Sequence, residues 1–184
     1  GIKYLISKKD WISKHRLPEP EGYKDGQMIT EDTVLRIIET DKKRASYSIQ
    51  PGSYIIYIPS AYKEAKRKSV IEKYIKSLLK RECENRLVPL LERMAKNEKI
   101  RIKEIRVKSM KSRWGSCNHE NVITLNSALV LVPVELAEYV LCHELAHTRH
   151  LNHGEKFWRE VEKMLPDYKI RRKRMRKYNS AKII

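Results

Sequence analysis

The chain has 184 residues, of which 41% are hydrophobic; this suits one globular domain with or without a small appendage and excludes a disordered protein. Its 40 Lys and Arg against 23 Asp and Glu give a formal net charge of +17, which attracts polyanions. No uninterrupted run of about 18 apolar residues is present, so the sequence indicates no membrane span.

Residues 1–60 are expected to form a β-rich N-terminal part. Two runs in it, Val34–Glu39 and Ser53–Ile58, are dominated by β-branched and aromatic residues, as is typical of strands. Pro51-Gly52 lies between them and indicates a turn. We expect this part to be continuous with residues 61–184, so that the whole chain forms one domain.

The segment Ala61–Asn97 is predicted to be helical, because its apolar residues recur at helix spacing between Lys and Glu. Pro89 is expected to kink or divide this helix, since proline lacks the amide hydrogen that the helix needs. Strand patterns resume at Ile102–Lys108, Ser112–Cys117 and Val122–Leu125, with a hairpin turn before the last of them.

A further helix is predicted over Pro133–Leu151, because proline is favoured at the first helical position. Asn152 and Gly154 follow, and both are typical of a helix stop. Two more helices are expected beyond this stop, at Glu155–Leu165 and Tyr168–Tyr178.

Four histidines and a glutamate lie within eleven residues at this helix end. On a helix, His143 and His147 are one turn apart on the same face, so both imidazoles can reach one Zn²⁺. His153 follows the expected stop and can approach the ion from another direction. His150 is the alternative third ligand, but the seven residues of straight helix after His143 rise about 10.5 Å, which is too far for one ion. We therefore favour His153.

The same pattern predicts a hydrolytic centre with one zinc ion per chain. Three neutral imidazoles leave one coordination position for water, and the ion lowers the pKa of that water towards about 7. Glu144 beside the first ligand can act as the general base and later pass the proton to the leaving group. A structural zinc site is disfavoured, since such sites usually have four ligands and are rich in cysteine.

Several motifs resemble, in chain order, those of the YgjP-like family of small prokaryotic zinc-dependent metallopeptidases, which is related to SprT-like domains. The motifs are Arg113–Cys117, Ile123–Asn126, His143–His147, Asn152–Gly154 and Phe157-Trp158. The resemblance covers about Lys111–Tyr168, and the strand and helix pattern before it also fits. This combination is far more specific than the His-Glu-x-x-His motif alone.

The resemblance implies a compact, zincin-like α+β domain. A small antiparallel-type sheet would pack against a long helix and against the helix of the His-Glu-x-x-His motif, and residues 61–184 would form the catalytic part. The resemblance also implies that His143, His147 and His153 bind zinc and that Glu144 is catalytic.

Further site residues are expected around this centre. In zincins a strand at the edge of the cleft pairs with an extended substrate, and Arg113–Cys117 is the candidate for that strand. Gly115 would let a substrate backbone approach closely, and Arg113 either clamps a phosphate or carboxylate or is a surface charge. Trp114 is a further substrate-binding candidate, although a core position is favoured. Tyr168 is the candidate donor to the transition state.

Basic residues crowd the C-terminus, where they form either a solvated helix face or a nucleic-acid-binding surface. The candidate nucleic-acid-binding residues are Lys169, Arg171, Arg172, Lys173, Arg174, Arg176 and Lys177.

The three cysteines are widely spaced and odd in number, so they form no disulfide framework. No apolar signal-peptide core follows Gly1. We therefore expect a cytoplasmic protein.

Three functions are compatible with these features. The favoured one is a zinc metallopeptidase that acts on a peptide or protein through a zinc-bound water and Glu144. The alternatives are a metal-dependent nucleoside triphosphate (UTP) pyrophosphatase and a DNA-associated protease docked through its basic C-terminus. Three histidines favour zinc and the peptidase, because Mg²⁺ prefers an oxygen shell. The positive charge favours the alternatives.

Overall fold

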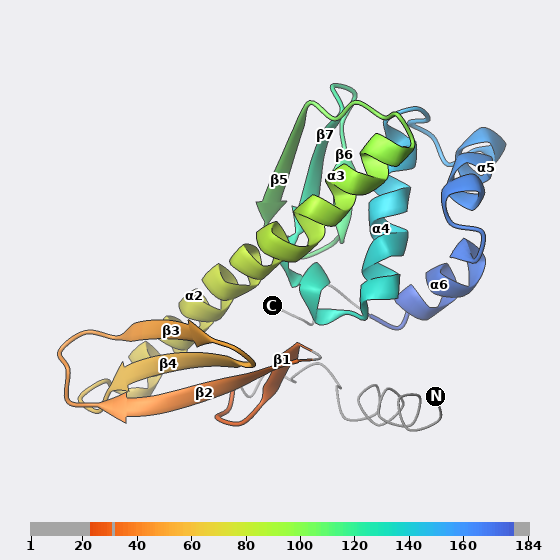
Figure 1. Cartoon of the computed structure of the whole chain (residues 1–184). Coiled ribbons are helices and arrows are strands. Elements are labelled where there is room, and N and C mark those ends of the chain that lie inside the picture. The colour runs from red at the N-terminus through yellow and green to blue at the C-terminus, as the bar shows by residue number, and fades with distance from the viewer. Residues whose placement is uncertain (1–22, 31, 179–184) are drawn as a thin grey trace. The chain divides into compact units, whose positions relative to one another are not determined.

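The computed structural model describes residues 23–30 and 32–178, which form a mixture of helices and small sheets (Figure 1). This confirms the α+β prediction. The chain divides into two compact units, the first ending at Leu78 and the second beginning at Leu79. Within the described residues, no helix combines the length and apolar character that a bilayer crossing requires.

The first unit is built on a four-stranded sheet in the order β1-β2-β4-β3. Its strands are β1 (Met28–Thr30), β2 (Thr33–Thr40), β3 (Ser46–Gln50) and β4 (Ser53–Pro59). The two predicted strands are present as β2 and β4. They are neighbours and run parallel, because β3 lies between them in the chain and pairs antiparallel with β4. Gly52 in the turn before β4 has a φ of +71°, a conformation that favours glycine.

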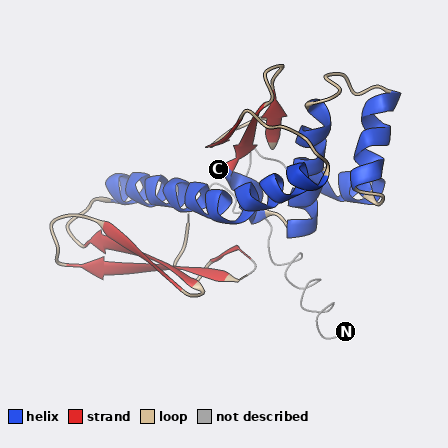
Figure 2. Cartoon of the chain, turned by 45° about the horizontal axis from the view of Figure 1, so that its top comes forward, coloured by secondary structure: helices blue, strands red, loops and turns tan. Residues whose placement is uncertain are grey.

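Helix α2 (Glu64–Glu82) begins in the first unit and ends in the second. Within the first unit it runs along the four-stranded sheet (Figure 2). The Tyr74 hydroxyl donates a 2.7 Å hydrogen bond to the Ala45 carbonyl, and the Tyr74 ring lies 5.2 Å from that of Tyr47. These contacts fix the helix on the edge of the sheet next to β3.

The division that Pro89 predicts occurs just before it. A π-helical turn (Cys83–Leu87) follows α2, and α3 (Val88–Asn97) has Pro89 in its first turn. The amide of Val88 bonds to the Cys83 carbonyl, five residues back, so the ladder is already out of α-helical register where the proline enters.

The second unit contains a three-stranded sheet in the order β5-β7-β6. Its strands are β5 (Glu104–Lys108), β6 (Gly115–Cys117) and β7 (Val122–Asn126). β6 and β7 form the predicted antiparallel hairpin, but β5 and β7 are parallel. Each sheet is therefore mixed: it contains the expected antiparallel pairing and one parallel pair. β6 is a short strand at the edge of this sheet.

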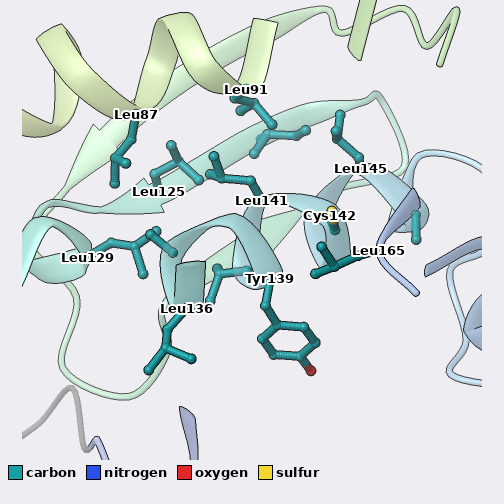
Figure 3. Close-up of a cluster of buried hydrophobic side chains, with 14 of the residues drawn as sticks. Leu87, Leu91, Leu125, Leu129, Leu136, Tyr139, Leu141, Cys142, Leu145 and Leu165 are labelled. Carbon is teal, nitrogen blue, oxygen red and sulfur yellow. The ribbon is translucent and has the colours of Figure 1, made fainter. Parts of the chain in front are cut away.

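Helix α4 (Val134–His147) is central to the second unit and contacts β6, α5 (Glu155–Met164) and α6 (Tyr168–Met175). Its apolar residues Leu136, Leu141 and Leu145 belong to the hydrophobic core, and in Figure 3 Leu141 and Leu145 point toward α3 and the sheet. All three are completely buried. The motif helix is therefore held rigidly on the side that does not carry the histidines.

Candidate metal centre

The structure brings together the three histidines that the sequence singles out. His143 and His147 come from α4, and His153 comes from the loop before α5. The Nε2 atom of His143 lies 3.2 Å from Nε2 of His147 and 3.0 Å from Nε2 of His153. All three candidate ligand atoms lie within 4.8 Å of one another, so one small ion can contact them all.

The protonation of the two α4 histidines suits a cation. Nδ1 of His147 lies 3.0 Å from the backbone carbonyl of His150, and because a carbonyl only accepts, this nitrogen carries the proton. Nε2 of the neutral ring then presents a lone pair to the centre. Burial lowers the pKa of His147 and, together with the neighbouring histidines, lowers the pKa of His143 to about 3. Converging lone pairs repel one another unless a cation lies between them.

The donor set also matches zinc in size. Zn–N bonds of about 2.0–2.1 Å in tetrahedral geometry place the nitrogens roughly 3.3 Å apart. Two measured separations, 3.2 Å and 3.0 Å, are close to this value. The three residues present therefore fit a zinc ion.

The chain turns earlier than expected after the motif. α4 ends at His147 and not near Leu151, because the Thr148 hydroxyl takes up the Leu145 carbonyl and the amides of Thr148 and Arg149 bond to carbonyls only three residues back. The straight helix from His143 to His150, on which the exclusion of His150 as a ligand depended, is therefore absent. His150 contributes its backbone carbonyl, and its ring is not part of the cluster.

Glu144 is buried beside the histidines, with 4% of its surface exposed. Burial raises the pKa of its carboxyl to about 8, and the charge of Arg113 opposes this rise. Oxygen Oε2 of Glu144 is buried without a hydrogen-bond partner. An unpaired buried carboxylate is costly, so this oxygen is positioned for a partner that the folded chain does not supply.

Strand β6 lies directly against Glu144. A Cβ atom added to Gly115 would stand 2.7 Å from both Cγ and Oε1 of Glu144, which is closer than side chains pack. Glycine is required here for close approach, since its φ is not positive. Arg113 is exposed and Trp114 is half-buried against the core.

Asn126 holds the segment that leads into β6, a role that the sequence did not reveal. Its side-chain amide donates to the carbonyls of Met110 and Arg113, while its Oδ1 accepts from the amides of Met110 and Ala128. Its own amide bonds to the Trp114 carbonyl. The motif Ile123–Asn126 ends on this residue, and a completely buried asparagine in such a position signals a structural network.

Aromatic rings surround the histidines. Phe157 lies 4.6 Å from the His147 ring, and Trp158 stacks on His153 at 5.8 Å and on Tyr168 at 5.5 Å. Tyr168, the expected donor, is buried and reaches the centre only through Trp158. Tyr139 was missed, although it stands one helical turn before His143 and its ring is 6.0 Å away.

The basic C-terminal residues are not a uniform free surface. Arg171 binds the carboxylates of Glu138 and Asp167, Arg174 binds Glu135, and Lys169 binds Glu162. These pairs fasten α6 to α4 and α5. Arg172 instead lies over the Trp158 ring, with its Cζ atom 4.3 Å from the ring centroid. Lys173, Arg176 and Lys177 are exposed and form no ion pair within the described residues.

Comparisons with known proteins give one family and two structures. A family model described as "YgjP-like, metallopeptidase domain" matches residues 2–178. The crystal structure of the metallopeptidase zymogen of Pyrococcus abyssi abylysin is 31% identical over 48% of this chain and 91% of its own, with a TM-score of 0.44. That of Methanocaldococcus jannaschii jannalysin is 25% identical over 48% of this chain and 93% of its own, with a TM-score of 0.40. Among curated proteins none matches. Because both TM-scores are low, the family assignment depends on the family model.

Proposed function

The chain belongs to the YgjP-like metallopeptidase family, and on this premise we propose that it is a zinc-dependent peptidase with one ion held by His143, His147 and His153. The observation that carries the proposal is the convergence of three imidazole nitrogens at separations that fit zinc. When bound, zinc supplies a Lewis acid that polarises a carbonyl and makes water more acidic.

Glu144 is the proposed general base. Its buried, unpartnered Oε2 is available to take a proton from the attacking water and to pass it to the leaving amine. A base works best when its pKa is near the working pH, and burial has moved the pKa of this carboxyl in that direction. Its contact with Gly115 fixes its position along β6.

β6 is proposed to bind the substrate backbone. It is an edge strand, with β7 as its one partner in the sheet, so an extended peptide can add a further strand. Gly115 allows that peptide to approach the base closely. Arg113 at the start of this segment is exposed and carries no ion pair in the described part of the chain, so it is available to an acidic group of the substrate.

Two phenols are candidates for a hydrogen bond to the transition state. Tyr168 is the one that the sequence suggested, and Tyr139 lies on the same helix face as the first two histidines. The variants Tyr139→Phe and Tyr168→Phe, each of which removes one hydroxyl, test which of the two phenols has this role. Removing the hydroxyl of the phenol that acts should lower kcat by about 10²-fold or more, with zinc retained.

Nucleoside triphosphate hydrolysis is the second candidate function, because Arg113 and Arg172 place positive charge beside the base and the histidines. Docking on nucleic acid is the third, and it would depend on Lys173, Arg176 and Lys177, which form no ion pair within the described residues. We favour the peptidase, since three imidazoles are a poor magnesium site.

One parallel assay tests these choices. Zinc-loaded protein and its Glu144→Gln variant are offered an unfolded protein pool and, separately, nucleoside triphosphates. We expect fragments from the protein pool with the parent alone, and zinc retained in both. Glu92→Gln, which removes an exposed carboxylate on α3, is the matched control and should cleave normally. Triphosphate hydrolysis that needs Glu144, without proteolysis, would reject the peptidase.

A further inference from the structure

We propose that Arg172 binds a carboxylate of the peptide substrate beside the metal centre, and so selects substrates that carry this group. The inference rests on the proposed peptidase function and names a part of the substrate that the function alone does not specify. It depends on the position of Arg172, on its lack of an acidic partner and on the way Trp158 holds it.

The position of Arg172 is set by the aromatic rings around the histidines. Its guanidinium carbon is 4.3 Å from the centroid of the Trp158 ring. That ring in turn stacks on His153 at 5.8 Å and lies 6.0 Å from the ring of His143.

Arg172 differs from its neighbours on α6 in having no carboxylate partner among the described residues. Arg171 has two carboxylate partners and a backbone carbonyl, and Arg174 has one carboxylate. Arg172 lies between them in sequence and is half-buried, yet no carboxylate of the described residues pairs with it. A half-buried cation without a counter-ion is stabilised when it binds an anion from outside the chain.

The contact with Trp158 leaves the guanidinium able to bind a carboxylate. A guanidinium that lies over an aromatic ring keeps its N–H groups in its own plane, where they remain free to donate. Two parallel N–H groups match the two oxygens of a carboxylate. The stacking also restricts the side chain before binding, so less conformational freedom is lost when the substrate arrives.

The two arginines near the centre have different roles in this scheme. Arg113 precedes β6, the strand that lies against Glu144, whereas Arg172 lies over Trp158, which stacks on His153. A peptide paired with β6 passes the base, and its carboxylate meets Arg172 where it reaches the histidines. That carboxylate is either the C-terminal group of the peptide or the side chain of Asp or Glu.

Three peptides of one length distinguish these sources: penta-alanine with a free C-terminus, the same peptide with a C-terminal amide, and an amidated peptide with one internal Asp. Binding to zinc-loaded Glu144→Gln protein is measured by titration calorimetry, so that no turnover interferes. We expect Arg172→Gln to weaken binding of a carboxylate peptide by about 10-fold to 100-fold and to leave the plain amide unchanged. Whichever carboxylate peptide shows this loss identifies the source.

Control variants separate this role from others. Arg172→Lys keeps the charge but not the planar pair of donors, and should recover only part of the affinity. Lys156→Gln removes an exposed charge two residues before Trp158, on the other side of α5, and should change nothing. The zinc content and Tm of each variant are measured in the same samples.

Several results would overturn the inference. Equal weakening of acid and amide peptides, or loss of zinc with Arg172→Gln, would make Arg172 a positioning residue for His153. The same loss with Lys156→Gln would reduce the effect to general electrostatics. Cleavage that is indifferent to Arg172 would refute the inference while leaving the peptidase intact. Binding of pyrophosphate alone, and of none of the peptides, would refute both.

Discussion

Replacing Gly115 with alanine should disable the proposed base without removing the metal. The added Cβ would stand 2.7 Å from Cγ and Oε1 of Glu144 and 2.9 Å from its Cδ. Ordinary contacts are about 3.5 Å or more, so the carboxylate must move by roughly 0.8 Å. Because only 4% of Glu144 is exposed, its side chain has little room to give. A misplacement of about 1 Å lowers catalysis on the order of 10²-fold, and the overpacking destabilises the fold by about 1–3 kcal/mol.

The assay compares kcat for peptide hydrolysis and the zinc content of Gly115→Ala with those of the parent. Gly154→Ala is the matched control, because a Cβ at this position meets nothing within 4 Å and the φ of Gly154 is −75°. We expect the control to retain full activity. A fully active Gly115→Ala enzyme would refute the reasoning, since it would show that Glu144 can shift freely or does not act as the base.

Further predictions concern pH, the Asn126 network and the third ligand. In metal-free protein the pKa of Glu144 is raised to about 8 in the folded state, from 4.5, so its stabilising effect is complete below pH 4.5 and is lost as the pH rises through about 8. Thermal melts should therefore show metal-free protein losing up to about 1.4 kcal/mol per pH unit relative to Glu144→Gln in this window, and parallel curves would exclude the shift. Asn126→Ala should lower the free energy of unfolding by about 3 kcal/mol in urea titrations, because it leaves several buried backbone groups unpaired; a loss below about 1 kcal/mol would contradict the network. His153→Ala should weaken zinc affinity at least about tenfold in a chelator competition, whereas His150→Ala, which keeps its backbone carbonyl, should not; the reverse order would reassign the third ligand.

Much of the centre could be predicted from the chain because its information is local. His143 and His147 are one helical turn apart, and Asn152 and Gly154 indicate a turn that returns His153 to them. The break at Pro89 was also predictable, since it depends on one residue's missing amide hydrogen.

What could not be predicted depends on long-range contacts. β3 was missed because Ser46–Gln50 has few apolar residues, and its insertion is what makes β2 and β4 parallel. The end of α4 at His147 depends on bonds from Thr148 and Arg149, and the sequence pattern does not reveal which carbonyls they take. The basic C-terminus looked uniform, yet ion pairs with Glu135 and Glu138 divide it into structural and free residues.

The fold explains why the centre is precise. α4 is fixed by the buried core on one side, so the histidines on its other side have little freedom. Asn126 fixes the start of the β6 segment, and Gly115 brings that strand against Glu144. Base and proposed substrate strand are therefore positioned by the same folded unit.

The most direct test of the zinc centre is the X-ray absorption spectrum of the zinc-loaded protein. Our account predicts three imidazole nitrogens and one further light atom at about 2.0–2.1 Å from zinc. His153→Ala should reduce the imidazole contribution by one. Scattering from sulfur at about 2.3 Å, or a spectrum that is unchanged by His153→Ala, would contradict the assignment of His143, His147 and His153 as the ligands.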